Sequence, residues 1–217
     1  MENNIYWIGG SSCSGKSSCA KLLAEQNNYV LYKTDDYAFG KYMFGLDNIQ
    51  EYPAIEKYKN QICEGVNSFI ERDTNISYRS FVEYCHEVFP FLLSDVIELS
   101  KGNSVIVEGA HILPELLANN GINERAIFLI STEDQQRAIW RKEMNKEILG
   151  GNEHEINDYQ QTANKKAFED ARIGLHQKIA DHIRTEAIKY GKEYMLVTQD
   201  TSVTKVRDAV VSYFRLR

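Results

Sequence analysis

The sequence predicts an α/β protein built on an open parallel β-sheet, and two patterns in the chain carry this prediction. Short runs rich in Val, Ile, Leu and Tyr recur along the 217 residues, and segments with helical periodicity separate them. The apolar runs are nearly continuous, as expected when helices cover both faces of a sheet. Strands that alternate with helices form βαβ units, which produce a parallel sheet. The five predicted strands cover residues 4–8, 29–33, 104–108, 125–130 and 194–198.

The predicted helices follow from apolar residues spaced three or four apart. Leu22 and Leu23 follow a glycine-rich turn, and the later helical periods cover residues 55–69, 81–99 and 163–187. About 70 residues separate the second strand from the third, and about 60 separate the fourth from the fifth. These intervals are too long for simple crossovers. We therefore expect one domain over residues 1–217, with a helical substrate cap at 44–100 and a helical lid at 132–190. The alternative is that these intervals are extra helices that only pack on the core.

Composition and charge exclude several classes of protein. The chain is 43% hydrophobic and 26% charged, which excludes a disordered or collagen-like protein. No apolar run approaches the length of a membrane span and the first residues show no signal peptide, so we expect a cytoplasmic protein. The net charge is −6, and residues 44–100 alone carry this imbalance, with ten acids and four cations. We expect no nucleic-acid partner, because that affinity needs clustered cations, and a chain that acts as a monomer or homodimer.

The four cysteines do not have the spacing of a metal site. None belongs to a C-x-x-C pair, and no histidine follows at zinc-ligand spacing. We expect reduced thiols at all four positions, which are Cys13, Cys19, Cys63 and Cys85.

A glycine-rich turn directly after the first predicted strand contains the pattern G-x-x-x-x-G-K-S, from Gly10 to Ser17. Glycines allow the backbone to curl so that successive N–H groups point at phosphate oxygens, and the following helix adds the positive end of its dipole. In such a loop Lys16 reaches the β- and γ-phosphates, and Ser17 supplies a hydroxyl to Mg²⁺. The sequence therefore predicts a nucleotide-binding loop formed by Gly10, Ser11, Ser12, Cys13, Ser14, Gly15, Lys16, Ser17 and Ser18.

Two carboxylates follow the second predicted strand, 19 and 20 residues after Lys16. The carboxyl ends of parallel strands share one crevice, so Asp35 and Asp36 are expected to face the γ-phosphate. A carboxylate there can accept the proton of an attacking hydroxyl or hold Mg²⁺ through water. A solvated turn or a helix N-cap is the alternative.

The third predicted strand ends in an acid, Glu108, and His111 follows it. An acid leaving a hydrophobic strand at this depth is costly unless it meets a cation, a metal or a water network. Glu108 is therefore a candidate for orienting Mg²⁺ or its water, or else an ordinary acid at a strand end. His111 either reaches the substrate or is a structural histidine.

Basic residues occur in both long helical intervals. Arg137 and Arg141 lie four residues apart on the helix expected after Thr132, where they can straddle a transferring phosphoryl group, with Arg172 a weaker candidate for the same role. The alternative is a solvated helix face on which they pair with Glu133 and Glu143.

Three further features are candidate ligand contacts, and two of them have a second interpretation. Arg79 is the candidate substrate contact within residues 44–100. The loop after the last strand either packs on an adenine base through Asp200 or caps the final helix with Asp200 and Ser202. Aromatic residues around the 44–100 segment either stack on a substrate ring or belong to the core; they are Tyr37, Phe39, Tyr42, Phe44, Tyr78, Phe81 and Tyr84.

Taken together, these motifs resemble the P-loop small-molecule kinases of the nucleoside-monophosphate-kinase fold. The opening GGSSCSGKSS resembles the phosphate loop of chloramphenicol phosphotransferase-like proteins, and TDDY is similar to a segment of uridine and nicotinamide riboside kinases. VIVEGAHILP resembles both the E-G strand of those kinases and the E-G-V-H segment of 2-phosphoglycerate kinases. These matches cover about 30 residues, and the 44–100 segment matches none of the families.

The resemblance implies a three-layer P-loop fold whose five-stranded parallel sheet has the order 2-3-1-4-5. It also implies that Asp35 is the general base, that Lys16 and Ser17 hold phosphates and Mg²⁺, that Glu108 assists the metal or the substrate, and that Arg137 and Arg141 belong to a lid. We therefore expect an ATP- and Mg²⁺-dependent kinase that phosphorylates a hydroxyl of a small metabolite. A nucleoside or nucleotide kinase, an antibiotic-type phosphotransferase and a regulatory ATP-binding protein are the alternatives.

Overall fold

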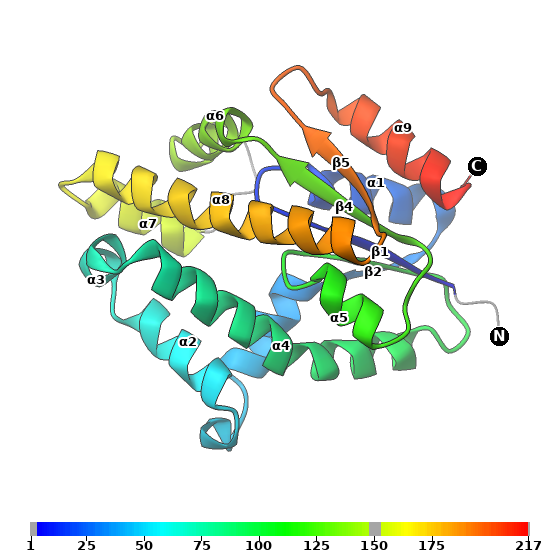
Figure 1. Cartoon of the computed structure of the whole chain (residues 1–217), viewed down its shortest axis with the longest axis horizontal. Coiled ribbons are helices and arrows are strands. Elements are labelled where there is room, and N and C mark those ends of the chain that lie inside the picture. The colour runs from blue at the N-terminus through cyan, green and yellow to red at the C-terminus, as the bar shows by residue number, and fades with distance from the viewer. Residues whose placement is uncertain (1–3, 148–152, 217) are drawn as a thin grey trace.

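The computed structural model describes residues 4–147 and 153–216, and at its centre is a five-stranded, all-parallel sheet with the strand order β2-β3-β1-β4-β5 (Figure 1). The predicted α/β class and the five predicted strands are confirmed, each strand end to within two residues, and the order is the one that the resemblance implies. The strands are β1 (Ile5–Gly10), β2 (Val30–Lys33), β3 (Val105–Glu108), β4 (Ala126–Ser131) and β5 (Glu193–Val197).

Helices cover both faces of the sheet (Figure 1). Two of them, α1 (Lys16–Asn27) and α9 (Val203–Phe214), lie on one face. The other face carries α4 (Thr74–Leu99), α5 (Pro114–Asn119) and α8 (Lys165–Lys189). The remaining helices are a π-helix η1 (Asp36–Met43), a 3-10 helix η2 (Ile49–Glu51), α2 (Pro53–Cys63), α3 (Val66–Glu71), α6 (Glu133–Met144) and α7 (Glu153–Gln161).

The core is divided between the two faces because successive side chains of a strand point in opposite directions. In β1, Tyr6 and Ile8 contribute to the cluster under α1 and α9, whereas Trp7 belongs to the larger cluster under α4 and α8. All three side chains are buried. This two-sided burial explains why the apolar runs in the sequence do not alternate with polar residues.

The register of the sheet brings the candidate site residues to one edge. Lys33 at the end of β2 lies beside Glu108 at the end of β3, which in turn lies beside Ile8 of β1. Strands β2 and β3 therefore end at the same level, and β1 continues two residues further to Gly10 at the same edge of the sheet. Gly10 ends β1 with φ 136°, and a Cβ at this position would collide with the backbone oxygen of Leu129 on β4. Only glycine suits both this backbone conformation and this close approach.

The two long intervals are helical, as predicted, but they differ in detail from the periodicity. The helical period over residues 55–69 is divided at Gly65, whose φ of 84° ends one helix and begins the next, giving α2 and α3. The periodicity does not predict η1, which begins at Asp36, the second of the two candidate carboxylates, directly after Asp35. The 132–190 region contains α6, α7 and α8, and its residues 148–152 lie outside the described part of the chain. The roles of cap and lid stay predictions.

No helix among residues 4–147 and 153–216 combines the length and the apolar composition that crossing a bilayer requires.

Candidate functional site

The loop between β1 and α1 is held in place by hydrogen bonds from its own serines. The Ser11 backbone N–H donates to the Leu129 oxygen at 3.0 Å, and the Ser14 hydroxyl donates to the Ser11 oxygen at 2.8 Å. Gly15, with φ 80°, occupies the N-cap position of α1 and provides no side chain to cap the helix. The amide groups of the first helical turn thus have no side-chain acceptor from the cap residue, and a helix start of this kind favours an anion.

A chain of buried hydrogen bonds connects this loop to the helices beyond β4. The hydroxyls of Ser11 and Ser131 are 2.8 Å apart, and the Ser131 hydroxyl donates to the Ser12 oxygen at 2.6 Å. The Gln136 side chain on α6 donates to the Ser131 hydroxyl at 3.0 Å and accepts from Gln177 on α8 at 2.8 Å. The loop, α6 and the middle of α8 are therefore joined by polar contacts in a buried setting, where such contacts are costly to break.

Lys16 lies at the centre of the site. Its side chain is buried, and its Nζ donates to the Ser11 oxygen at 3.1 Å across the loop. The charge of Lys16 acts on three carboxyls: it helps to lower the pKa of Asp35, and it opposes the burial that raises the pKa of Glu108 and of Glu143. The structure therefore brings together the lysine of the predicted loop and the acids of the two neighbouring strand ends.

Ser17 and Glu108 form the second contact between the loop and the sheet. The Ser17 hydroxyl donates to Glu108 Oε2 at 3.1 Å. Burial and the nearby Asp35 carboxylate raise the pKa of Glu108, against the opposing effects of Lys16 and Ser17. Within the described ranges, no group of three or more His, Cys, Asp or Glu side chains forms a metal cage. A serine hydroxyl and one or two carboxylates nevertheless fit Mg²⁺, which takes few protein oxygens and completes its octahedron with phosphates and water.

Asp35 is held by a histidine from the neighbouring strand end. His111 Nδ1 lies 3.1 Å from Asp35 Oδ1 and 3.2 Å from Thr34 Oγ1. The Asp35 side chain is 53% exposed, whereas His111 is 1% exposed. Loss of hydration raises the pKa of Asp35. The hydrogen bond from His111 and the positive charges of His111 and Lys16 outweigh this effect, so the pKa of Asp35 lies below its usual range. Asp35 is thus an ionised carboxylate with one open side, which suits it to accept a proton.

Close packing fixes this histidine in place. The rings of Phe39, Phe81 and Tyr84 have centroids 5.3, 5.9 and 5.5 Å from that of His111. Gly109 has φ 149°, and a Cβ there would collide with the Thr34 hydroxyl that shares Nδ1. Of the two interpretations of His111, the structure favours a histidine that positions Asp35.

The two arginines of α6 contact carboxylates rather than lying open. Arg137 pairs with Glu133 at 2.8 Å and reaches Glu169 and Asp170 on α8, each at 3.0 Å. Arg141 pairs with Glu169 at 2.7 Å. The pairing with Glu133 agrees with the solvated-face interpretation, whereas Glu169 was missed because α8 is remote in the sequence. In this structure the two guanidinium groups link α6 to α8.

The other candidate residues lie away from this centre or have a simpler role. Ser202 caps α9, its hydroxyl accepting from the Lys205 N–H at 3.1 Å, and Asp200 is exposed in the turn before it. Asp36 is exposed in the first turn of η1. Arg79 is also exposed, and it donates to the Asn75 backbone oxygen at 3.3 Å. It is not among the residues that line the cavity described next.

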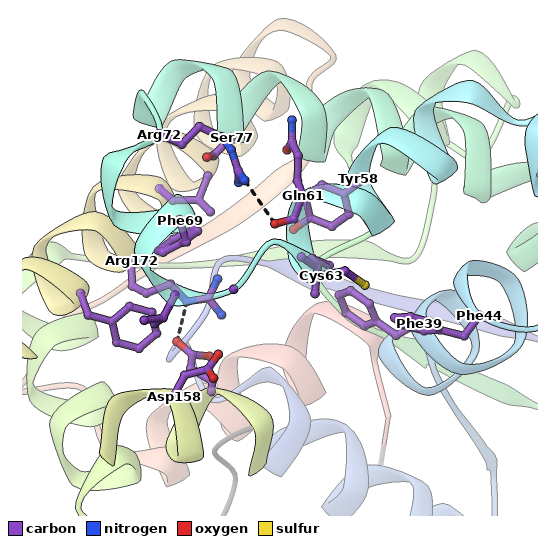
Figure 2. A pocket seen from close by; sticks show the side chains of 16 residues that line it. Phe39, Phe44, Tyr58, Gln61, Cys63, Phe69, Arg72, Ser77, Asp158 and Arg172 are labelled. Carbon is purple, nitrogen blue, oxygen red and sulfur yellow. Dashed lines mark hydrogen bonds and ion pairs between the residues drawn. The ribbon is translucent and has the colours of Figure 1, made fainter. Parts of the chain in front are cut away.

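A cavity of about 470 Å³ opens beside the site, between η1, α2, α3 and the helices α7 and α8 (Figure 2). Its size is in the usual range for small-molecule pockets. Arg72 and Arg172 line it, in place of the expected Arg79. Its wall also contains Phe39, Phe44, Tyr58, Gln61, Ile62, Cys63, Gly65, Val66, Phe69, Ser77, Glu155, Asp158, Phe168 and Leu175.

The cavity adjoins the loop and Asp35 through shared side chains. Phe39 lines it and also contacts His111, the partner of Asp35. Cys13 of the loop packs on the apolar cluster to which the cavity residues Phe168 and Phe69 belong. Periodicity gave no indication of the cavity, because its walls come from several helices that only the tertiary fold brings together.

Glu143 on α6 is an ionisable residue that the sequence placed only on a solvated face. Burial and the Glu155 charge raise its pKa to about 7, while Lys16 opposes them. The Glu143 carboxyl binds its proton more tightly in the folded state than in the unfolded state. Its contribution to the free energy of unfolding is therefore present below about pH 4.5 and is lost as the pH rises through about 7. We expect Glu143→Gln to stabilise the fold by about 1–3 kcal/mol at pH 8 and by less than about 1 kcal/mol at pH 5.

Denaturant unfolding at the two pH values measures this difference. Glu147→Gln, which replaces an exposed carboxylate after the same helix, is the matched control and should show no gain at either pH. A gain from Glu143→Gln that is equal at pH 5 and pH 8 would contradict the raised pKa.

Comparisons with known proteins add little to this geometry. No protein-family model matches the sequence, and no curated protein matches it. Among solved structures, the chain is similar to an uncharacterized protein from Eubacterium ventriosum ATCC 27560, with 15% identity, a TM-score of 0.46 and 100% of both chains covered. A likeness at this level carries no information on function, so the site is interpreted from its own residues.

Proposed function

We propose that this protein is a P-loop kinase that uses Mg²⁺ and ATP to phosphorylate a hydroxyl group of a small metabolite. The observation that carries the proposal is the environment of Lys16. This buried lysine crosses a G-x-x-x-x-G-K-S loop, and its charge acts on carboxylates at the ends of two neighbouring strands. An anion-binding loop with a cation and two acids at one sheet edge is the arrangement that phosphoryl transfer needs. On this proposal, the three-layer fold is that of the P-loop NTPases.

Each residue has a definite part in this mechanism. The amides at the start of α1 and the Lys16 ammonium bind the β- and γ-phosphate oxygens. Ser17 and Glu108 would hold Mg²⁺, directly or through water, and the ion would supply positive charge beside the phosphates. Asp35 accepts the proton of the acceptor hydroxyl through its exposed side, while His111 keeps the carboxylate oriented. The acceptor occupies the adjoining cavity, whose apolar walls exclude water from the reaction.

The alternatives make different predictions for the same assay. A regulatory ATP-binding protein would hydrolyse ATP slowly, with no acceptor-dependent turnover. A kinase of phosphorylated acceptors would require arginines with free charge in the cavity, whereas Arg72 and Arg172 both pair with carboxylates. The arrangement of charge therefore favours transfer to an acceptor that is not yet phosphorylated.

A coupled ADP-release assay tests the proposal. We expect one class of acceptor, among nucleosides, sugar acids, vitamins and antibiotics, to raise ADP release well above the rate with ATP and Mg²⁺ alone. Chelation of Mg²⁺ should remove this stimulated rate. A chain that binds ATP but shows no acceptor-stimulated release across the panel would instead support the regulatory alternative.

A further inference from the structure

Both arginines of the cavity are already neutralised by the protein. Arg172 Nε lies 2.6 Å from Glu155 Oε1, which also accepts from Trp140 Nε1 at 2.9 Å. Burial raises the pKa of Glu155, but the charge and hydrogen bond of Arg172 outweigh it and lower this pKa to about 2. Arg72 pairs with Glu64, and it donates to the Gln61 backbone oxygen at 3.2 Å (Figure 2). The two guanidinium groups therefore serve the protein's own acceptors.

The cavity wall consequently offers no excess positive charge. Two cations, Arg72 and Arg172, and two acids, Glu155 and Asp158, line the cavity. Glu64 adds a third acid beside Arg72. A phosphate or carboxylate entering this space would lose its hydration and approach two buried or half-buried acids. The cost of removing a charge from water is recovered only by a good opposite partner, and these partners are occupied.

The remaining surface of the cavity is suited to a flat ring. Five aromatic side chains line it, from η1, from the 44–100 segment and from α8. Figure 2 shows Phe39 and Phe44 on one side of the space and Phe69 on the other. Planar ligands gain stacking and edge contacts from such walls in addition to burial of apolar area. The five are Phe39, Phe44, Tyr58, Phe69 and Phe168.

One polar atom of a lining residue lacks a partner. Gln61 donates through Nε2 to the Ser80 hydroxyl at 3.0 Å, but its Oε1 is buried without a hydrogen-bond partner among the described residues. A buried acceptor left in this state is costly, and a shift of the Gln61 amide toward the cavity would let an N–H or O–H group of a ligand satisfy it.

We infer that the acceptor is an uncharged alcohol that carries a flat ring and a hydrogen-bond donor, and that the Arg172–Glu155 pair excludes its anionic counterparts. The inference rests on the proposed function only in treating this ligand as the phosphoryl acceptor. The ligand class itself is a property of the cavity and is measured by binding without ATP.

A matched pair of probes that differ by one charge tests the inference. 4-(Hydroxymethyl)benzamide keeps the ring, the alcohol and an N–H donor, whereas 4-(hydroxymethyl)benzoate replaces the amide with a carboxylate. In NMR titrations of the labelled protein, we expect the benzamide to shift the amide signals of Cys63 and Gly65 and to bind at least about tenfold more tightly than the benzoate. Equal or tighter binding of the benzoate, or no shift at these signals with the benzamide, would overturn the inference.

A charge variant provides the second measurement. Glu155→Gln keeps an oxygen for Trp140 but leaves Arg172 without its anion, so affinity for the benzoate should rise about tenfold while that for the benzamide changes little. Glu153→Gln, an exposed acid on the same helix, is the control and should leave both affinities unchanged. Unchanged benzoate affinity in a folded Glu155→Gln variant contradicts the inference, and if the variant does not fold, the wild-type probe pair decides. Absence of ADP release alongside benzamide binding would count against phosphoryl transfer and support the ligand class.

Discussion

Replacing Asp35 by asparagine is expected to lower acceptor-stimulated ADP release by about 10²–10⁴-fold, the usual range for loss of a general base. The amide keeps an oxygen for His111 Nδ1 at the position of the present 3.1 Å contact, so the local geometry should persist. It cannot accept the proton of the acceptor hydroxyl. ATP affinity, measured by calorimetry, should stay within a few-fold of wild type because the phosphates are held by the loop.

Asp36→Asn is the natural comparison, since the sequence left both acids as candidates for the base. Asp36 is exposed at the start of η1, whereas the charge of Lys16 helps to lower the pKa of Asp35. We expect the Asp36 variant to keep most of its turnover. Full activity of the Asp35 variant would remove the assignment of Asp35, and loss of activity only in the Asp36 variant would move the base to that residue.

Lys16→Ala should weaken nucleotide binding itself, by at least about tenfold, and should remove measurable turnover. The substitution removes the ammonium that crosses the loop, and with it part of the positive charge that balances Glu108 and Asp35. Repulsion between these acids and the phosphates then adds to the loss of the charge-assisted contact. Calorimetry with ATP in the presence of Mg²⁺ measures the effect.

Lys21→Ala is the matched control for this experiment, because Lys21 is exposed on the same helix. It should bind ATP as the wild type does. Thermal unfolding of both variants separates a binding defect from a folding defect. Wild-type affinity in a folded Lys16→Ala variant would contradict the role of the loop in phosphate binding.

The strands of the sheet and the glycine-rich loop could be predicted from the sequence because both depend on local patterns. Strands buried on both faces leave continuous apolar runs, and the loop has its own spacing of glycine, lysine and serine. The contact of Asp35 with His111 follows from the strand order, since β2 and β3 are neighbours and their ends lie at one level. Sequence alone therefore placed the base candidate near its partner, without showing that they touch.

The ion pairs and the cavity could not be read in this way because they depend on how distant helices face one another. Arg141 and Glu169 are 28 residues apart, and Arg172 and Glu155 are 17 apart on different helices. Periodicity identifies the apolar face of each helix but not which helix it meets. This is why Arg79 is the arginine that the sequence singles out, whereas Arg72 is the one that lines the cavity.

The buried hydrogen bonds from Ser11 to Gln177 restrict how the 132–190 region can move. A rigid-body swing of the whole region would break them and would also pull Ile179 and Ile183 out of the core. The first turns of α8 are held in the same way, because Phe168 and Ile173 are buried against Trp140 of α6, so α6 and α8 are expected to move as one unit. The contacts of Arg137 and Arg141 with Glu169 join the same two helices, so they would persist through any movement of this region.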